Sequence, residues 1–212
     1  MINRKEKTFL IFDFDNTLAD TLAVIIEIMK RLAEKEGFGQ VTEKQIKLFR
    51  EKETIEACRQ LKIPLKKLPS IIKVAKKDFS QQVGNFKLHN GIKELLINLK
   101  NKGFNLGILT SNSVVNVQKF LNRNQIDCFD FVYSENNIFG KARGLNNLVK
   151  KHKINRQKAF YIGDEIRDIQ AAQKAGLKII AVGWGFNTIE ALKEQKPDFL
   201  VNKPQEILKI LS

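Results

Sequence analysis

Short apolar runs and helix-like segments take turns along most of the chain. Six runs are rich in β-branched and aromatic residues and stop at polar or turn residues, which predicts strands. They cover residues 8–12, 105–109, 129–133, 159–162, 178–182 and 198–201. Continuous apolar strands that alternate with helices are typical of a parallel sheet covered by helices on both faces. The pattern therefore predicts an α/β core.

The pattern between residues 21 and 83 is purely helical. Apolar residues first recur at helical spacing up to the glycines at positions 37 and 39, as at Leu22, Ile25, Ile26, Met29 and Leu32. Further helices are expected at 43–58 and 68–79, with breaks at Pro64 and Pro69. We expect a Rossmann-like parallel sheet core, formed by residues 1–16 plus 85–212, and a small all-helical domain at 17–84. A chain of 212 residues is long enough for both.

Composition narrows the class of protein. The chain is 43% hydrophobic and 28% charged, as in an ordinary globular protein. Its two cysteines, Cys58 and Cys128, are too few for a disulfide framework or a zinc site, and we expect core thiols. The first apolar run already contains Asp13 and Asp15, which neither a signal peptide nor a spanning helix would tolerate. We expect a cytoplasmic protein without a membrane partner.

The formal net charge of +14 favours anionic partners. The lysines are scattered along helix-like segments and rarely alternate with aromatic residues, as they would on a platform that stacks bases. We interpret most of them, including the pairs at 66–67 and 76–77, as solvated helix faces. A small phosphorylated metabolite is therefore the expected partner, and no nucleic acid.

The first candidate site residues follow the strand at 8–12. In open parallel sheets ligands bind beyond the carboxyl ends of the strands. Asp13 and Asp15 are two residues apart in extended chain, so their side chains lie on the same side. Two neighbouring carboxylates repel each other, which raises one pKa or requires a cation.

The full string DFDNTLADT at residues 13–21 resembles the first motif of the haloacid dehalogenase superfamily, in its phosphatase branch. The resemblance implies that Asp13 is the nucleophile that forms an aspartyl-phosphate. It implies that Asp15 protonates the leaving oxygen and later activates water, with Thr17 helping to hold Asp15. A dehalogenase has no use for a proton donor at Asp15, so the phosphatase branch is favoured.

Two further clusters supply candidate phosphate ligands. Thr110 and Ser111 open the string TSNS after the strand at 105–109, where donors at a helix start favour an anion or simply cap the helix. In the family a Thr or Ser here binds the transferred phosphate, and Thr110 matches that position, with Ser111 as the alternative. Lys141 would screen the repulsion between phosphate and nucleophile. Family members usually carry Lys-Pro here, whereas this chain has Lys141-Ala142, and Arg143 is the alternative cation.

The last cluster is the string GDEIRDIQAAQKAG at 163–176, which follows an apolar run. Asp164 and Asp168 lie one helical turn apart, so both can face one point above the sheet, although an acidic first turn also suits a helix dipole. The string resembles the acidic metal motif of the family, which implies Mg²⁺ held by Asp13, Asp164, Asp168 and the backbone carbonyl of Asp15. Carboxylate and carbonyl oxygens without His or Cys suit Mg²⁺.

The motifs occur in family order over nearly the whole chain, and the helical stretch matches a cap inserted after the first motif. Phosphoglycolate-phosphatase-like members look closest. The leading hypothesis is a Mg²⁺-dependent phosphatase that hydrolyses a small phosphomonoester through an aspartyl-phosphate on Asp13. A sugar phosphomutase would keep the same residues and differ in how the cap excludes water. The charge alone allows a basic nucleic-acid-binding or regulatory protein on this fold. We expect a monomer.

Overall fold

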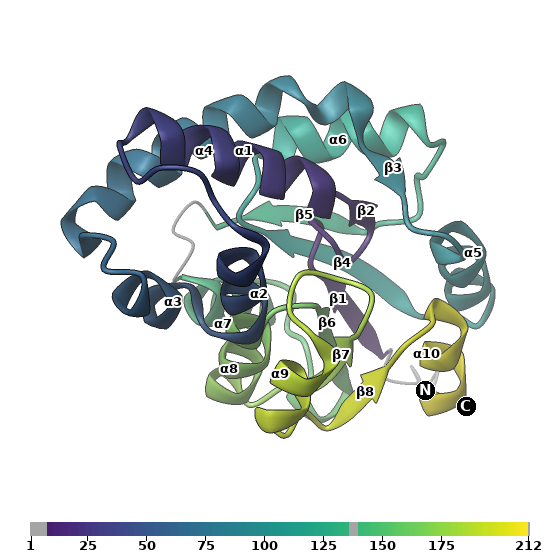
Figure 1. Ribbon diagram of the computed structural model, residues 1–212. Coiled ribbons are helices and arrows are strands. Elements are labelled where there is room, and N and C mark those ends of the chain that lie inside the picture. Colours follow the sequence, from purple (N-terminus) through teal and green to yellow (C-terminus); the bar gives the residue numbers. More distant parts are fainter. Residues whose placement is uncertain (1–7, 136–139, 212) are drawn as a thin grey trace, which may run out of the picture.

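The computed structural model describes residues 8–135 and 140–211, and Figure 1 shows how their helices surround a central sheet. This large sheet has six parallel strands in the order β5-β4-β1-β6-β7-β8. The strands are β1 Phe9–Phe12, β4 Asn105–Thr110, β5 Phe131–Ser134, β6 Ala159–Gly163, β7 Lys178–Val182 and β8 Phe199–Val201. The six strands expected from the apolar runs are thereby confirmed to within two residues at each end.

The strand order places the carboxyl end of β1 at a reversal of the topology. The chain adds β4 and then β5 on one side of β1, and β6, β7 and β8 on the other. At such a point the connections leave in opposite directions, and the crevice above the strand ends is the usual ligand site. Residues that follow β1, β4 and β6 are therefore neighbours in space.

Helices cover both faces of the large sheet because side chains of β1 alternate between two hydrophobic clusters. Leu10 and Phe12 pack with apolar residues of one helical layer, and Ile11 packs with those of the other. The first layer consists of α5 Ile92–Asn101, α6 Val114–Arg123 and α10 Pro204–Ile210. The second consists of α7 Lys141–Lys151, α8 Ile166–Ala175 and α9 Ile189–Glu194. The predicted α/β core flanked by helices is confirmed.

The helical insertion leaves and rejoins the core through a small antiparallel sheet. Its strands are β2 Ala19–Asp20 and β3 Lys87–Leu88. Between them lie α1 Leu22–Lys35, α2 Glu43–Glu51, α3 Thr54–Gln60 and α4 Leu68–Gln81. Short 3₁₀ helices cover Leu65–Lys67, Val83–Asn85 and, in the core, Arg156–Lys158. The small all-helical domain is confirmed, while the boundaries 1–16 plus 85–212 and 17–84 stay a prediction.

Two details of the insertion differ from the expectation. The single helix expected at 43–58 is divided, because the carbonyl of Arg50 accepts bonds from the Thr188 amide at 2.9 Å and the Asn187 side chain at 2.9 Å. That oxygen is thus bonded to the core instead of continuing the helix. Pro69 lies in the first turn of α4, where a proline is tolerated, and marks the start of a helix instead of a break.

Both cysteines are free thiols, with Cys58 buried and Cys128 half-buried. Within residues 8–135 and 140–211, no helix is long and apolar enough to cross a membrane. The segment before Thr8 lies outside the described residues, and the cytoplasmic location stays a prediction.

Candidate functional site

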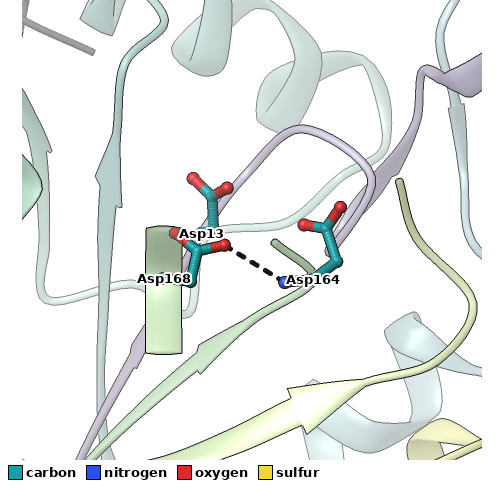
Figure 2. A group of neighbouring side chains, drawn as sticks. All are labelled: Asp13, Asp164 and Asp168. Carbon is teal, nitrogen blue, oxygen red and sulfur yellow. Dashed lines mark hydrogen bonds between the residues drawn. The ribbon is translucent and has the colours of Figure 1, made fainter. Parts of the chain in front are cut away.

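Three aspartates meet beyond the carboxyl ends of β1 and β6. Asp13 follows β1, Asp164 follows β6, and Asp168 lies in the first turn of α8. One carboxylate oxygen from each lies within 4.8 Å of the other two, and all three side chains are buried. Figure 2 shows the three carboxylates around one point above the strand ends. The strand order thus brings together residues that are 151 positions apart in the sequence.

The electrostatics of this cluster suit a divalent cation. Burial raises the pKa of Asp13 to about 6, although the Lys141 ammonium lowers it, and the neighbouring charge of Asp168 raises it. Burial and the charges of Glu165, Asp168 and Asp13 raise the pKa of Asp164 well above its usual value. Buried carboxylates that repel one another gain from a cation between them, and their hard oxygens match Mg²⁺. The donor set therefore fits the expected metal.

Lys141 is the first residue of α7 and is as buried as the acids it contacts. Its Nζ lies 2.8 Å from Oδ2 of Asp13 and also donates to Oδ1 of Asp168. Burial alone would lower the pKa of Lys141, but the attraction of Asp13 and Asp168 raises it, so the ammonium stays charged. Arg143 projects differently: its side chain is 65% exposed and pairs with Glu135 at 2.9 Å. Of the two expected cations, Lys141 is the one that touches Asp13.

Asp168 is held from several directions. Besides Lys141, it accepts bonds on Oδ2 from the backbone amides of Asp164 at 3.2 Å, drawn in Figure 2, and Glu165 at 3.1 Å. A Cβ on Gly163 would lie 2.5 Å from the same oxygen, so the strand end must be glycine for this carboxylate to fit. Asp168 thereby fixes both the turn into α8 and the direction of the lysine.

Asp164 is oriented by two donors from outside its own segment. The Thr17 hydroxyl donates to Oδ1 at 2.7 Å, and the Phe186 amide donates to Oδ2 at 2.8 Å. The expectation that Thr17 holds Asp15 is therefore wrong, because its hydroxyl is directed at Asp164. Trp184 supports this arrangement by donating from Nε1 to the Thr17 carbonyl at 3.1 Å.

Asp15 lies outside the three-aspartate cluster and has its own partner. Its two carboxylate oxygens lie 3.2 and 3.4 Å from Nδ2 of Asn112. Burial and the nearby charge of Asp13 raise the pKa of Asp15 to about 7, although the Asn112 bond lowers it. A carboxyl group with such a pKa exchanges its proton readily near neutral pH, as a general acid and base must.

Thr110 ends β4 and is fully buried beside the end of β1. Its hydroxyl oxygen accepts a bond from the backbone N–H of Asn112 at 2.9 Å, which fixes the turn that leads into α6. Ser111 is half-buried in the same turn. Both lie at the end of a strand that neighbours β1, and which of them holds a phosphate stays a prediction.

Three residues near the site carried no assigned role in the sequence. Asn112 had only an ambiguous signal as part of a capping string, and Arg167 lay unremarked between Asp164 and Asp168. Lys76 of α4 was expected on a solvated face, but it is half-buried. Burial and the charge of Arg167 lower the pKa of Lys76, whereas the charge of Asp15 raises it, which sets this lysine close to both. A helical segment without a motif gives no sign of such proximity.

Comparison with known proteins agrees with the fold. The haloacid dehalogenase-like hydrolase family matches residues 10–182. A phosphoglycolate phosphatase of Synechococcus elongatus is 30% identical over 204 residues, which cover 96% of each chain. A pyrophosphatase, PpaX, of Bacillus cereus is 30% identical over 125 residues, or 57% of this chain and 58% of that one.

A solved structure has the same fold. It is a haloacid dehalogenase-like family hydrolase of Streptococcus pneumoniae, with a TM-score of 0.82 at 22% identity, and the match covers 98% of this chain and 99% of that one. The resemblance to phosphoglycolate-phosphatase-like members is confirmed by the full-length relative. Because the family match spans most of the residues that form the sheet and the site, the chain belongs to the haloacid dehalogenase-like hydrolases.

Proposed function

We propose that this hydrolase is a Mg²⁺-dependent phosphatase that acts on a small phosphomonoester through an aspartyl-phosphate on Asp13. The observation that carries the proposal is the contact of Asp13 with Lys141, at 2.8 Å, beside the carboxylates of Asp164 and Asp168. A nucleophilic carboxylate needs fixed positive charge before it can approach a phosphate dianion. The names of the relatives support a phosphate ester as the substrate.

The residues divide the work of phosphoryl transfer. An oxygen of Asp13 attacks phosphorus while the ester bond breaks, and the leaving oxygen takes the proton of Asp15. The Asp15 carboxylate then removes a proton from water, whose oxygen attacks phosphorus and releases phosphate and the Asp13 carboxylate. Lys141 screens charge in both steps, and Thr110, with Ser111 as the alternative, donates to the phosphoryl oxygens.

The metal fits the same arrangement. Asp13, Asp164 and the backbone carbonyl of Asp15 would hold Mg²⁺, with Asp168 binding it directly or through water. When bound, Mg²⁺ would neutralise the charge that develops on the transferred phosphoryl group. Asp168 also positions Lys141, so its loss would affect both cations at once.

The charge around Asp15 indicates the class of substrate. The helices 17–84 would form a cap that encloses a small molecule, and Lys76 and Arg167 bring positive charge to the side of Asp15. An acidic phosphorylated metabolite fits this charge. A panel of such compounds with purified protein, including phosphoglycolate, pyrophosphate, sugar phosphates and nucleotides, would identify it, and product analysis with a hexose 1-phosphate would reveal a phosphomutase.

The mechanism is tested by Asp13→Asn. We expect this variant to keep the far-UV circular dichroism and melting profile of a folded protein and to lose turnover of p-nitrophenyl phosphate. Asp127→Asn, at an exposed aspartate before the amino end of β5 and so away from the carboxyl ends of the strands, is the matched control. Undiminished turnover in Asp13→Asn would refute the mechanism.

The metal site is tested without an activity readout. Mg²⁺ is expected to raise the melting temperature of the wild type and to produce heat in a calorimetric titration. Asp164→Asn is expected to lose most of both effects, because it removes one buried carboxylate of the cluster. Equal Mg²⁺ affinity in the variant would exclude Asp164 as a ligand.

A further inference from the structure

The proton donor of the proposed reaction has a partner that the catalytic motifs do not include. Asn112 is 8% exposed, and its Nδ2 lies 3.2 and 3.4 Å from the two oxygens of Asp15. Asp15 is half-buried and, unlike Asp13, does not contact Lys141 in the described residues. The amide of Asn112 is thus the group that sets the direction of this carboxylate.

The orientation of the Asn112 amide follows from its other partners. Its Oδ1 accepts from the Ser113 backbone amide at 2.8 Å and from Nδ2 of Asn116 at 2.9 Å. The Ser113 backbone N–H can only donate, so a reversed Asn112 amide would face it with its own NH₂ group. The carbonyl must face α6 and the NH₂ group must face Asp15.

The chain of donors continues into the helical insertion. The second hydrogen of the Asn116 amide is directed at Oγ of Ser80, 2.9 Å away, and the Ser80 hydroxyl donates to the Lys76 carbonyl at 2.9 Å. Asn116 belongs to α6 of the core and Ser80 to the last turn of α4. Both helices run along the upper side of the view in Figure 1. Ser80, Asn116 and Asn112 thus connect α4 to Asp15 through consecutive, directional hydrogen bonds.

Helix capping alone does not account for this chain. Ser113 already caps α6, since its hydroxyl oxygen accepts a bond from the backbone N–H of Asn116 at 3.2 Å. Asn116 is 7% exposed, and its side-chain NH₂ group donates to Asn112 and to Ser80, which both lie outside α6. Burying a side-chain amide costs free energy unless its polar groups are hydrogen-bonded. The two bonds of Asn116 therefore stabilise its buried position, and they join α6 to Asn112 and Ser80.

We propose that Asn112 positions Asp15 for proton transfer to the leaving group, and that Asn116 and Ser80 couple this position to the seating of α4 on the core. Asn112, Asn116 and Ser80 are positioning residues, because they act through Asp15. The inference rests on the proposed phosphatase function. In this arrangement Asp15 is correctly aligned as the proton donor only when Ser80 of α4 lies against α6.

The experiment compares two substrates that differ in their need for a proton. The leaving group of an alkyl phosphate is a strongly basic alkoxide that must be protonated, whereas the leaving group of p-nitrophenyl phosphate is a stable phenolate. The ratio of kcat/KM for the two reports proton donation, because kcat/KM includes the steps up to departure of the leaving group. General acid catalysis contributes about 10²- to 10⁴-fold, so loss of alignment has a large range to act in.

Asn112→Ala is expected to lower kcat/KM for the alkyl phosphate by about 10- to 100-fold and for p-nitrophenyl phosphate by about threefold or less. Asn116→Asp keeps the shape but presents an acceptor to Asn112, which turns the Asn112 NH₂ group away from Asp15, so the same selective loss is expected. Asn116→Asp also serves as the second test if Asn112→Ala fails to fold.

Ser80→Ala is expected to show a smaller selective loss, about three- to tenfold, and Ser80→Thr to restore the wild-type ratio because it keeps the hydroxyl. Ser70→Ala and Asn122→Ala are the matched controls. Ser70 lies in the first turn of α4 and its hydroxyl donates to the Lys67 carbonyl at 2.8 Å, and Asn122 is an exposed asparagine of α6. Within the described residues, neither is hydrogen-bonded to Ser80, Asn116, Asn112 or Asp15, so both are expected to keep the wild-type ratio.

An equal loss on both substrates in Asn112→Ala and Asn116→Asp would overturn the positioning role, and Ser80→Thr behaving like Ser80→Ala would overturn the coupling to α4. These results differ from failure of the proposed function. In that case the wild type would hydrolyse neither substrate, or Asp13→Asn would hydrolyse both, and the inference would fall with the function.

Discussion

Among the ion pairs of the described residues, one group lies at the carboxyl edge of the large sheet and another on the helical insertion with α1 to α4. In the first, Lys141 and Asp13 have side chains that are 2% and 3% exposed. In the second, Arg31 and Asp78 lie at the similar distance of 2.7 Å, but their side chains are 52% and 22% exposed. Water screens the second pair much more than the first, so similar distances correspond to very different energies.

The difference separates charge that serves chemistry from charge that serves solubility. Charges in a dry site act strongly on a bound anion, and removing one leaves its partner buried and unpaired. Solvated pairs on a helix contribute little to stability. The net charge of +14 favours solubility and anionic partners, and it says little about the reaction.

The largest effect is expected for Lys141→Met. Asp13 and Asp168 would remain buried without their common cation, which costs about 3 to 5 kcal/mol in the free energy of unfolding. Loss of one charge-stabilising group is also expected to lower kcat by about 10²- to 10³-fold. Urea unfolding and phosphatase assays measure both effects. Lys150→Met, at an exposed position of the same helix, is the control, and similar losses in both variants would remove the contrast.

A smaller effect is expected from pH in the absence of Mg²⁺. The pKa of Asp15 rises from 3.8 in the unfolded chain to about 7, so the folded protein binds more protons between these values. Its contribution to the free energy of unfolding therefore falls as pH rises from 4 to 7, by at most about 4 kcal/mol. Urea unfolding with EDTA at several pH values should show a steeper slope in the wild type than in Asp15→Asn, which keeps the contributions of Asp13 and Asp164. Parallel profiles would contradict it.

Glycine substitutions sharpen the same contrast by sterics. A Cβ on Gly185 would lie 2.1 Å from Cβ of Asp164, whereas a Cβ on Gly84, beside the helical insertion, would meet nothing within 4 Å. We expect Gly185→Ala to lower the free energy of unfolding by about 1 to 3 kcal/mol and to weaken Mg²⁺ binding. Gly84→Ala should change stability by less than about 0.5 kcal/mol. Mg²⁺ titration and urea unfolding of both variants decide the matter.

The smallest effect is expected for the exposed pair of Arg31 and Asp78. A double-mutant cycle with Arg31→Met and Asp78→Asn should give a coupling energy of about 0.5 kcal/mol that declines with added salt. A coupling above about 2 kcal/mol, unaffected by salt, would mean that the insertion holds its charges as tightly as the core does.

The sequence predicted the parts of the site that depend on strand ends. Asp13, Thr110 and Asp164 each directly follow or end an apolar run, and parallel pairing must bring such residues to one edge. The contact of Asn112 with Asp15 was beyond that reasoning, because it depends on how the turn after β4 folds. Ser80 was further out of reach, since its partner is chosen by where α4 packs.

Local patterns also failed where distant contacts overrode them. The expected helix at 43–58 has suitable residues throughout, yet Arg50 is bound by the loop that carries Asn187 and Thr188. The two short strands β2 and β3 are too brief to give an alternating pattern. Both features join the insertion to the core, and a one-dimensional pattern contains no information about such junctions.

The β2–β3 pair has a consequence for how this chain can be re-engineered. Asp20 and Lys87 are paired across the two strands, so the 66 intervening residues enter and leave the core side by side. We expect that a replacement module whose ends are equally close can be joined at these two positions while the strand order of the large sheet is kept. The β2–β3 pair is therefore a natural junction for domain exchange, and different inserted modules there would be carried by one and the same α/β core.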